Sequence, residues 1–370
     1  MRRMITLVLA GLILLCPAAR GSEALTVAAK GAVLIDGDSG RILFAQNADE
    51  MLPEASCTKV MTALLALENC ALSEEVTARK NAYGVPGTSI YLSEGETLTM
   101  EQMLYGLMLR SGNDAAVAIA EHVAGSVSDF AALANARAAE LNADAHFVNP
   151  HGLDADGHRI SALGLARIMR EALKHDDFRT ITGTKRKIIP WVGNEYSRVL
   201  ENKNRLLSTY SGATGGKTGF TSKAGRCLVF SAERDGLELI GAVLNCYTWF
   251  DTATVMLDYG FDNFRMERAL EAGQEAAQVR VLSGEQSSVR AVAAEALSGA
   301  VGIGKRVSVE VDTSTLTAPV RAGQVVGTAR LVSGGETIDS CSLVAAETVE
   351  AWSLAAAIRK VLRNWALQFA

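Results

Sequence analysis

The spacing of apolar residues changes from a β to a helical period several times along the chain. Apolar runs at residues 32–35 and 42–45 flank a short segment of Asp, Gly and Ser, which predicts a β-hairpin. Residues 56–67 follow a helical period and are apolar on nearly all sides, as in a helix buried within a domain. A second helical region covers residues 99–124.

This second helical region has both a start signal and an internal break. Thr99 and Gln102 stand at the spacing of a capping box, which favours a helix that begins at this point. The sequence Ser-Gly-Asn-Asp at residues 111–114 interrupts the pattern and predicts a loop between two helices. Asn113 or Asp114 is expected to cap the second helix.

Further elements predict a mixed fold. Residues 130–141 and 162–173 keep a helical period, and two β-rich runs at 226–232 and 237–245 meet at an Asp-Gly pair that indicates a second hairpin. An extended segment is expected from Thr221 to Ser231. We therefore expect an α+β sandwich, an antiparallel sheet flanked by helices, over residues 25–271.

The C-terminal third changes character. Short Val-rich segments separated by Gly and Ser predict a small all-β domain at residues 272–346. Residues 347–370 form a basic amphipathic helical pattern with two tryptophans, which favours a helix lying on a membrane surface. A helix packed on its own domain is the alternative. The apolar face of the pattern consists of Leu354, Ile358, Val361, Leu362, Trp365 and Phe369.

The N-terminus resembles an export signal. Arg2 and Arg3 precede an apolar run at residues 5–15, which is too short to span a bilayer and is followed by small residues. Residues 1–24 are therefore interpreted as a signal peptide, with an uncleaved anchor as the alternative. The expected location is the extracytoplasmic face of the cytoplasmic membrane, with peripheral attachment through the C-terminal helix.

Composition and charge narrow the function classes. The chain of 370 residues is 49% hydrophobic and 21% charged, as in ordinary globular proteins, and its net charge of -5 disfavours nucleic acid as a partner. No common zinc motif is present, and neither a metal nor a cofactor is expected. Five cysteines remain after the signal segment, an odd number without regular spacing, so they are interpreted as small core residues rather than disulfides.

Three short motifs carry candidate chemistry. Ser56 and Lys59 are three residues apart at a helix start, which places a hydroxyl and an amine on one face. A Ser-Gly-Asn loop follows at residues 111–113, and Lys217-Thr218-Gly219 precedes predicted β structure. Gly216-Lys217-Thr218 also ends like a phosphate-binding loop, but Ser211 stands where that motif needs Gly, and a strand rather than a helix is expected next.

Taken in order, the three motifs resemble the signature of the penicillin-binding and serine β-lactamase superfamily. The chain is most similar to low-molecular-mass penicillin-binding proteins, which are serine D-alanyl-D-alanine carboxypeptidases, over essentially its full length. That family has a small β domain and an amphipathic tail after its catalytic domain, in the order predicted here. The similar stretches are Leu34-Ile35-Asp36, residues 52–56, residues 106–114 and Asn149-Pro150-His151-Gly152-Leu153.

The resemblance implies an acyl-enzyme mechanism without a cofactor. Ser56 would attack the penultimate D-alanine carbonyl of a peptidoglycan pentapeptide stem, and Lys59 would accept the serine proton. For this, Lys59 must be uncharged, so its surroundings must lower a pKa that is near 10.4 in water. Ser111 would pass a proton to the leaving nitrogen, and Asn113 would orient Lys59 and the substrate amide.

The third motif would hold the substrate. Lys217 is expected to stay charged and to bind the terminal carboxylate together with the Thr218 hydroxyl. Gly219 leaves room for a peptide beside the strand, and the resemblance places the oxyanion hole at the N–H groups of Ser56 and Phe220. β-Lactam antibiotics are the expected covalent inhibitors.

Three alternatives remain open from the sequence. A serine β-lactamase shares the motifs but needs a base for rapid deacylation, and no convincing glutamate is evident. A non-catalytic wall-binding protein could retain the fold. A zinc peptidase that uses His151 and His158 is the remaining possibility, although His151 is interpreted as a structural loop residue.

Overall fold

The computed structural model describes residues 25–354 and residue 358. The predicted signal peptide, and the predicted tail helix from residue 355 on except residue 358, lie outside these residues. The start of the predicted tail helix was wrong, because residues 347–353 are not helical and Val349 and Ala351 form bridges to Val320 and Gly284. The helices of the described chain are η1 (Ala55–Thr58), α1 (Lys59–Asn69), α2 (Met100–Tyr105), η2 (Gly106–Arg110), α3 (Asn113–Ala124), α4 (Val127–Glu140), α5 (Ala162–Ala172), α6 (Asp176–Gly183), α7 (Leu206–Thr209) and α8 (Trp249–Asn263).

The strands fall into two parts of the chain. The first part contains β1 (Gly31–Asp36), β2 (Ile42–Gln46), β3 (Glu75–Thr77), β4 (Thr97–Thr99), β5 (Ala145–His146), β6 (Arg159–Ile160), β7 (Arg186–Ile189), β8 (Arg198–Glu201), β9 (Ala213–Thr221), β10 (Gly225–Arg234) and β11 (Leu237–Leu244). The second part contains β12 (Phe264–Leu270), β13 (Glu275–Leu282), β14 (Ser288–Ala293), β15 (Leu297–Gly302), β16 (Val307–Thr313), β17 (Leu316–Thr317), β18 (Val325–Ser333) and β19 (Glu336–Ala345).

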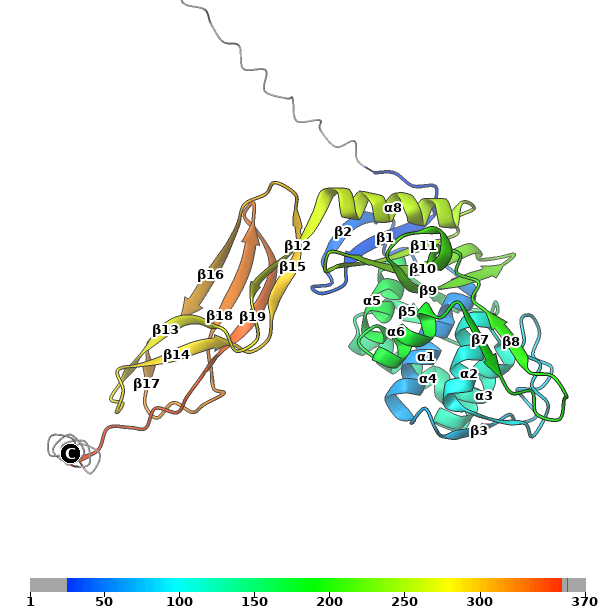
Figure 1. The fold of residues 1–370 in the computed structure, drawn as a ribbon, viewed down its shortest axis with the longest axis horizontal. Coiled ribbons are helices and arrows are strands. Elements are labelled where there is room, and N and C mark those ends of the chain that lie inside the picture. The colour runs from blue at the N-terminus through cyan, green and yellow to red at the C-terminus, as the bar shows by residue number, and fades with distance from the viewer. Residues whose placement is uncertain (1–24, 355–357, 359–370) are drawn as a thin grey trace, which may run out of the picture.

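A five-stranded antiparallel sheet organises the first part. Its strand order is β2-β1-β11-β10-β9, and helices cover both faces, with α8 on one side and α5 and α6 on the other (Figure 1). Side chains of β1 alternate between the two faces of the sheet. Val33 and Ile35 belong to the core between the sheet and the layer that contains α1 and α5, whereas Ala32 and Leu34 belong to the core between the sheet and α8. The predicted α+β sandwich and both predicted hairpins are therefore confirmed.

Helix α1 is the centre of the helical layer. Its residues from Lys59 to Ala66 are all buried, and it packs against α5 and α3. The predicted helix is confirmed, although its first turn is the 3-10 helix η1. The capping box of Thr99 and Gln102 is also confirmed at the start of α2.

Three local predictions were wrong. The N-cap of α3 is Gly112, because the side chains of Asn113 and Asp114 bind other segments of the chain. The segment from Thr221 to Ser231 is not continuous extended chain, because a turn separates β9 from β10. Cys70 is half-buried at the C-cap of α1, whereas the other four cysteines are buried; all five are free thiols.

The second part is all β. A six-stranded sheet contains β13, β14 and β16–β19, and a separate pair joins β12 to β15. The predicted boundary at residues 271 and 272 placed β12 in the first domain. The hydrogen bonds of β12 instead connect it to β15 in the second part. The two parts meet where the Asp36 carboxylate accepts the Ala300 N–H at 2.9 Å.

No single helix among the described residues is long and apolar enough to span a membrane. Helices α3 and α4 satisfy the length and composition criteria only as a pair, and they bend by 81° where they join.

Candidate active site

Ser56 lies at the turn that leads into α1. The preceding Ala55 has a φ of +50°, which is rare for a residue with a Cβ, and this turn directs the chain into η1. Ser56 is half-buried, while Cys57, Thr58 and Lys59 behind it are buried. The hydroxyl is thus reachable from solvent at the end of a helix whose body is within the core.

Lys59 joins three separate segments through its amine. Its Nζ lies 3.0 Å from Ser56 Oγ, 2.7 Å from Asn113 Oδ1 and 2.6 Å from the backbone oxygen of His151. The last two partners are carbonyl oxygens, which only accept hydrogen bonds. A neutral amine has two hydrogens, so both are used by these carbonyls and the lone pair is left for the Ser56 hydroxyl.

The electrostatic surroundings favour this neutral form. Burial, followed by the charges of Lys217 and Lys203, lowers the pKa of Lys59 well below its ordinary value of 10.5. Among the described residues, no carboxylate forms an ion pair with this amine. The geometry and the charge distribution therefore both prepare Lys59 to accept a proton from Ser56.

The second motif lies between η2 and α3. Ser111 has a φ of +65° and is buried, and its backbone oxygen accepts the Thr88 hydroxyl at 2.6 Å. Asn113 accepts from Lys59 through Oδ1 and donates from Nδ2 to Pro86 O at 2.6 Å. The amide is thereby fixed in one orientation. Ser111 makes no direct hydrogen bond to Ser56 or Lys59 in the part of the chain that the structure describes.

The third motif forms part of edge strand β9, which packs on η1. The Cys57 thiol donates to Lys217 O at 3.3 Å, and a Cβ at Gly219 would lie 2.5 Å from Glu54 O and 3.0 Å from Ser56 N. Only glycine allows β9 this close to the Ser56 turn. Phe220, the next residue, keeps 63% of its surface exposed.

Lys217 is a second buried amine in this cluster. It is 1% exposed and donates to Thr218 O at 2.7 Å. Burial, with a further contribution from Lys203, lowers the pKa of Lys217 to about 7. The surroundings of Lys217 therefore oppose its charged form, and the expectation that Lys217 stays charged requires a partner that stabilises its proton.

A buried polar network behind Ser56 escaped the sequence analysis. Glu54 Oε1 lies 2.9 Å from His158 Nε2 and accepts the Thr58 hydroxyl at 2.8 Å. The Val148 N–H donates to His158 Nδ1 at 3.0 Å, which leaves the ring proton on Nε2. Glu54 lies close in sequence to the Ser56 motif, but nothing in the sequence indicated its contact with the distant His158.

These contacts also argue against a zinc peptidase. The Nδ1 atoms of both His151 and His158 accept backbone N–H groups, and Nε2 of His158 faces Glu54. Burial lowers the pKa of His151 to about 3, with contributions from Lys59 and His158. His151 thus serves as a structural residue of the loop, as expected, and contacts the site through its backbone oxygen.

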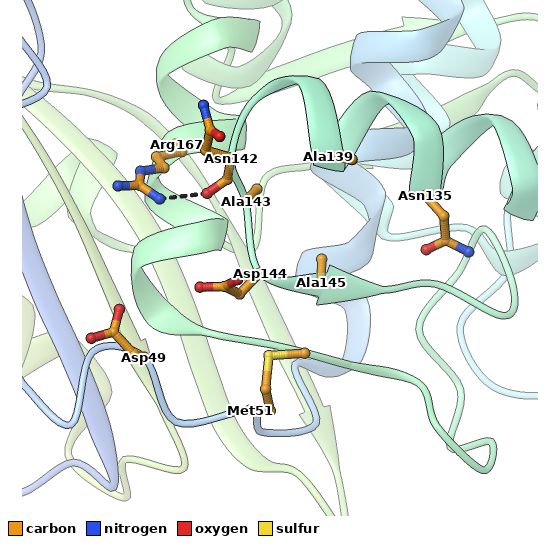
Figure 2. Close-up of a pocket in the computed structure, with 9 residues that line it drawn as sticks. All are labelled: Asp49, Met51, Asn135, Ala139, Asn142, Ala143, Asp144, Ala145 and Arg167. Atoms are coloured by element: carbon orange, nitrogen blue, oxygen red, sulfur yellow. Dashed lines mark hydrogen bonds between the residues drawn. The ribbon is translucent and has the colours of Figure 1, made fainter.

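A separate hollow of about 840 Å³ lies outside this cluster (Figure 2). It is lined by Asp49, Asp144 and Arg167 among others, and the Arg167 guanidinium donates to Asn142 O. None of the eight predicted site residues lines it. The converging side chains, rather than the size of this hollow, identify the candidate active site.

Comparisons with known proteins agree over both parts of the chain. Residues 18–248 match the family described as D-alanyl-D-alanine carboxypeptidase, and residues 264–351 match the C-terminal domain of penicillin-binding protein 5. The chain is 32% identical over 387 residues to the D-alanyl-D-alanine carboxypeptidase DacF of Bacillus subtilis, covering 99% of each chain.

Other relatives give the same result. Identity is 34% over 349 residues to the D-alanyl-D-alanine carboxypeptidase DacC of Escherichia coli, covering 89% of this chain and 86% of the relative. The crystal structure of penicillin-binding protein 5 from Haemophilus influenzae superimposes with a TM-score of 0.79 at 30% identity, covering 89% of this chain and all of that one.

The closeness of the loop at residues 149–153 to the Ser56 turn gives a prediction. Gly152 has a φ of +85°, and an added Cβ would overlap the backbone carbonyl of Ala55. Gly157 has a similar φ of +82°, but its Cβ would lie 3.3 Å from the His146 ring. Gly157→Ala should cost about 1 kcal/mol, mainly from backbone strain, because the exposed His146 ring can move away by the small distance needed.

Gly152→Ala should lower the free energy of unfolding by about 3 kcal/mol or more, because backbone atoms must move apart as well. Urea unfolding of the two variants measures the difference. Equal losses in both would show that the loop does not press on the Ser56 turn.

Proposed function

The chain belongs to the D-alanyl-D-alanine carboxypeptidase family of serine peptidases, and on this premise we propose that Ser56 is its nucleophile and Lys59 its general base. The enzyme removes the terminal D-alanine from peptidoglycan peptides, and β-lactams bind to members of this family. The observation that carries the residue assignment is the set of three contacts at Lys59 Nζ.

Acylation begins with a proton transfer over 3.0 Å. As Ser56 Oγ attacks the penultimate D-alanine carbonyl, its proton moves to the lone pair of Lys59. The resulting ammonium donates a third hydrogen bond while it keeps those to Asn113 and His151 O. The backbone N–H groups of Ser56 and Phe220 stabilise the developing oxyanion.

Breakdown of the tetrahedral intermediate needs a proton on the leaving nitrogen. We assign this transfer to Ser111, which passes the proton held by Lys59 to the amine of the departing D-alanine. Asn113 keeps Lys59 in place and binds the substrate amide. Water then attacks the ester, gives a proton to the Lys59 amine, and Ser56 Oγ recovers its proton when the acyl group leaves.

Substrate binding is assigned to β9. The protonated form of Lys217 and the Thr218 hydroxyl bind the terminal carboxylate, while Gly219 keeps β9 close to the Ser56 turn. A bound carboxylate favours the charged form of Lys217 and raises its pKa above the value of about 7 in the empty site.

We also propose that the two ends of the chain determine its location. Residues 1–24 direct export, and the tail at residues 347–370 attaches the enzyme peripherally to the membrane surface. The catalytic residues all belong to the proposed domain 25–271, and the all-β domain 272–346 separates them from the tail. The basic amphipathic pattern of the tail supports this division.

The first prediction concerns the nucleophile. Ser56→Ala should reduce D-alanine release from a pentapeptide by at least about 10⁴-fold and abolish covalent labelling by fluorescent penicillin, because no acyl-enzyme can form. Ser208→Ala, which changes an exposed serine, should retain both activities. Persistent labelling of the Ser56→Ala protein would reject the assignment.

The second prediction concerns pH. Carboxylate binding requires protonated Lys217, so kcat/KM for a free-carboxylate peptide should fall as the pH rises above about 7, where the empty site loses that proton. A peptide amide does not use this charge and should lack the alkaline decrease. Initial rates from pH 5 to pH 10 compare the two. The same decrease for both substrates would remove Lys217 from carboxylate binding.

The third prediction concerns the tail. A chain ending at residue 354 retains the contacts of Val349 and Trp352 with the β domain but lacks residues 355–370. It should lose binding to vesicles of phosphatidylglycerol and phosphatidylethanolamine while hydrolysing a soluble pentapeptide at an unchanged rate. Cosedimentation measures binding, and equal cosedimentation of both chains would exclude the tail as the membrane contact.

A further inference from the structure

Three side chains with metal-binding atoms converge at the end of α1 opposite Ser56. The Cys70 thiol, the Glu74 carboxylate and the His122 ring each present an atom within 4.8 Å of the other two. His122 Nε2 lies 3.1 Å from Glu74 Oε2. The residues come from the C-cap of α1, the turn before β3 and the last turn of α3. This cluster has no part in the proposed peptidase mechanism.

The local backbone prearranges the carboxylate. Glu74 Oε1 accepts the Ala71 N–H at 2.7 Å, and the Glu74 N–H donates to Ala71 O at 3.0 Å. This small ring directs Oε2 toward His122. Cys70 is in turn placed by the hydrogen bond from its N–H to Ala66 O. Two of the three groups are therefore positioned by main-chain contacts before any ligand binds.

We propose that Cys70, Glu74 and His122 bind one zinc ion, with water as the fourth ligand. A thiolate, an imidazole and a carboxylate together form a donor set that suits Zn²⁺, with bonds of about 2.0–2.3 Å. Tetrahedral coordination then requires the three atoms to be about 3.3–3.6 Å apart, which small side-chain rotations provide. The cluster is partly exposed, with side-chain exposure of 27% at His122 and 45% at Glu74, so water reaches it.

Proton balance follows from the contacts. A carboxylate only accepts, so the His122–Glu74 contact places the ring proton on Nε2 without metal. Zinc takes the Nε2 lone pair, and the ring proton moves to Nδ1. Zinc binds cysteine as the thiolate, so binding displaces one proton from the Cys70 sulfur. Binding therefore weakens as the pH falls.

The site has a structural consequence for the catalytic end. Lys59 begins α1 and Asn113 begins α3, and their side chains are in contact at 2.7 Å. Cys70 and His122 lie at the other ends of the same two helices. The ion would therefore connect α1 to α3 roughly 16 Å from the active site, since α1 has 11 residues and an α-helix rises about 1.5 Å per residue. Zinc stabilises this helix pair without entering the reaction.

Metal titration of the chelator-treated full chain tests the proposal. One Zn²⁺ should bind per chain, and Co²⁺ should give the near-ultraviolet absorption of thiolate-to-cobalt charge transfer. Cys70→Ser and His122→Gln should each weaken Zn²⁺ binding by about 100-fold or more. His146→Gln, which changes an exposed histidine on β5, should bind Zn²⁺ as the unmodified chain does.

A second measurement needs no variant. Zn²⁺ should protect Cys70 from alkylation by iodoacetamide, read by peptide mass mapping, because the thiolate is held by the metal. Zn²⁺ should also raise the thermal unfolding temperature of the chain but not of Cys70→Ser. The proposal is overturned by unchanged Zn²⁺ affinity in both ligand variants, by a cobalt complex without charge transfer, or by equal alkylation with and without Zn²⁺.

Discussion

The structure depends on the burial of one amine, that of Lys59, beside the Ser56 hydroxyl. An ammonium in this position loses its hydration and finds two neutral carbonyl partners but no ion pair among the described residues. The neutral amine meets no such cost, because its two hydrogens match the two carbonyls. In the proposed mechanism, the packing of a helix start rather than a histidine activates Ser56.

Holding this amine in place requires segments that are far apart in sequence. The loop at residues 149–153 supplies a backbone oxygen, α3 supplies an amide, and β9 approaches closely because Gly219 has no side chain. Behind the serine, Glu54 and His158 fix the turn from within the core. A change in any of these contacts alters the geometry at Ser56 without touching the substrate.

The sequence predicted elements with strong local signals. Both hairpins and the main helices follow from period and turn residues, and the first two motifs identified Ser56 and Asn113, whose side chains contact Lys59. The local sequence pattern gave wrong predictions where contacts between distant segments determine the structure. Gly112 caps α3 because the Asn113 side chain is used by Lys59, and β12 follows α8 without a turn signal. No pattern in the sequence indicates that Glu54 pairs with His158.

The two buried lysines are electrostatically coupled, and in the proposed mechanism the substrate carboxylate decides how they share charge. Burial and then the charge of Lys217 lower the pKa of Lys59, while burial lowers the pKa of Lys217 itself to about 7. A carboxylate at Lys217 stabilises its proton, and that retained charge opposes protonation of Lys59. The negative charge of the same carboxylate also offsets the charge of Lys217 and so favours protonation of Lys59. The distance between the carboxylate and Lys59 therefore decides which of the two effects is larger. The proposed mechanism therefore requires a terminal carboxylate that contacts Lys217 but not Lys59, because this arrangement leaves Lys59 neutral when a peptide is bound.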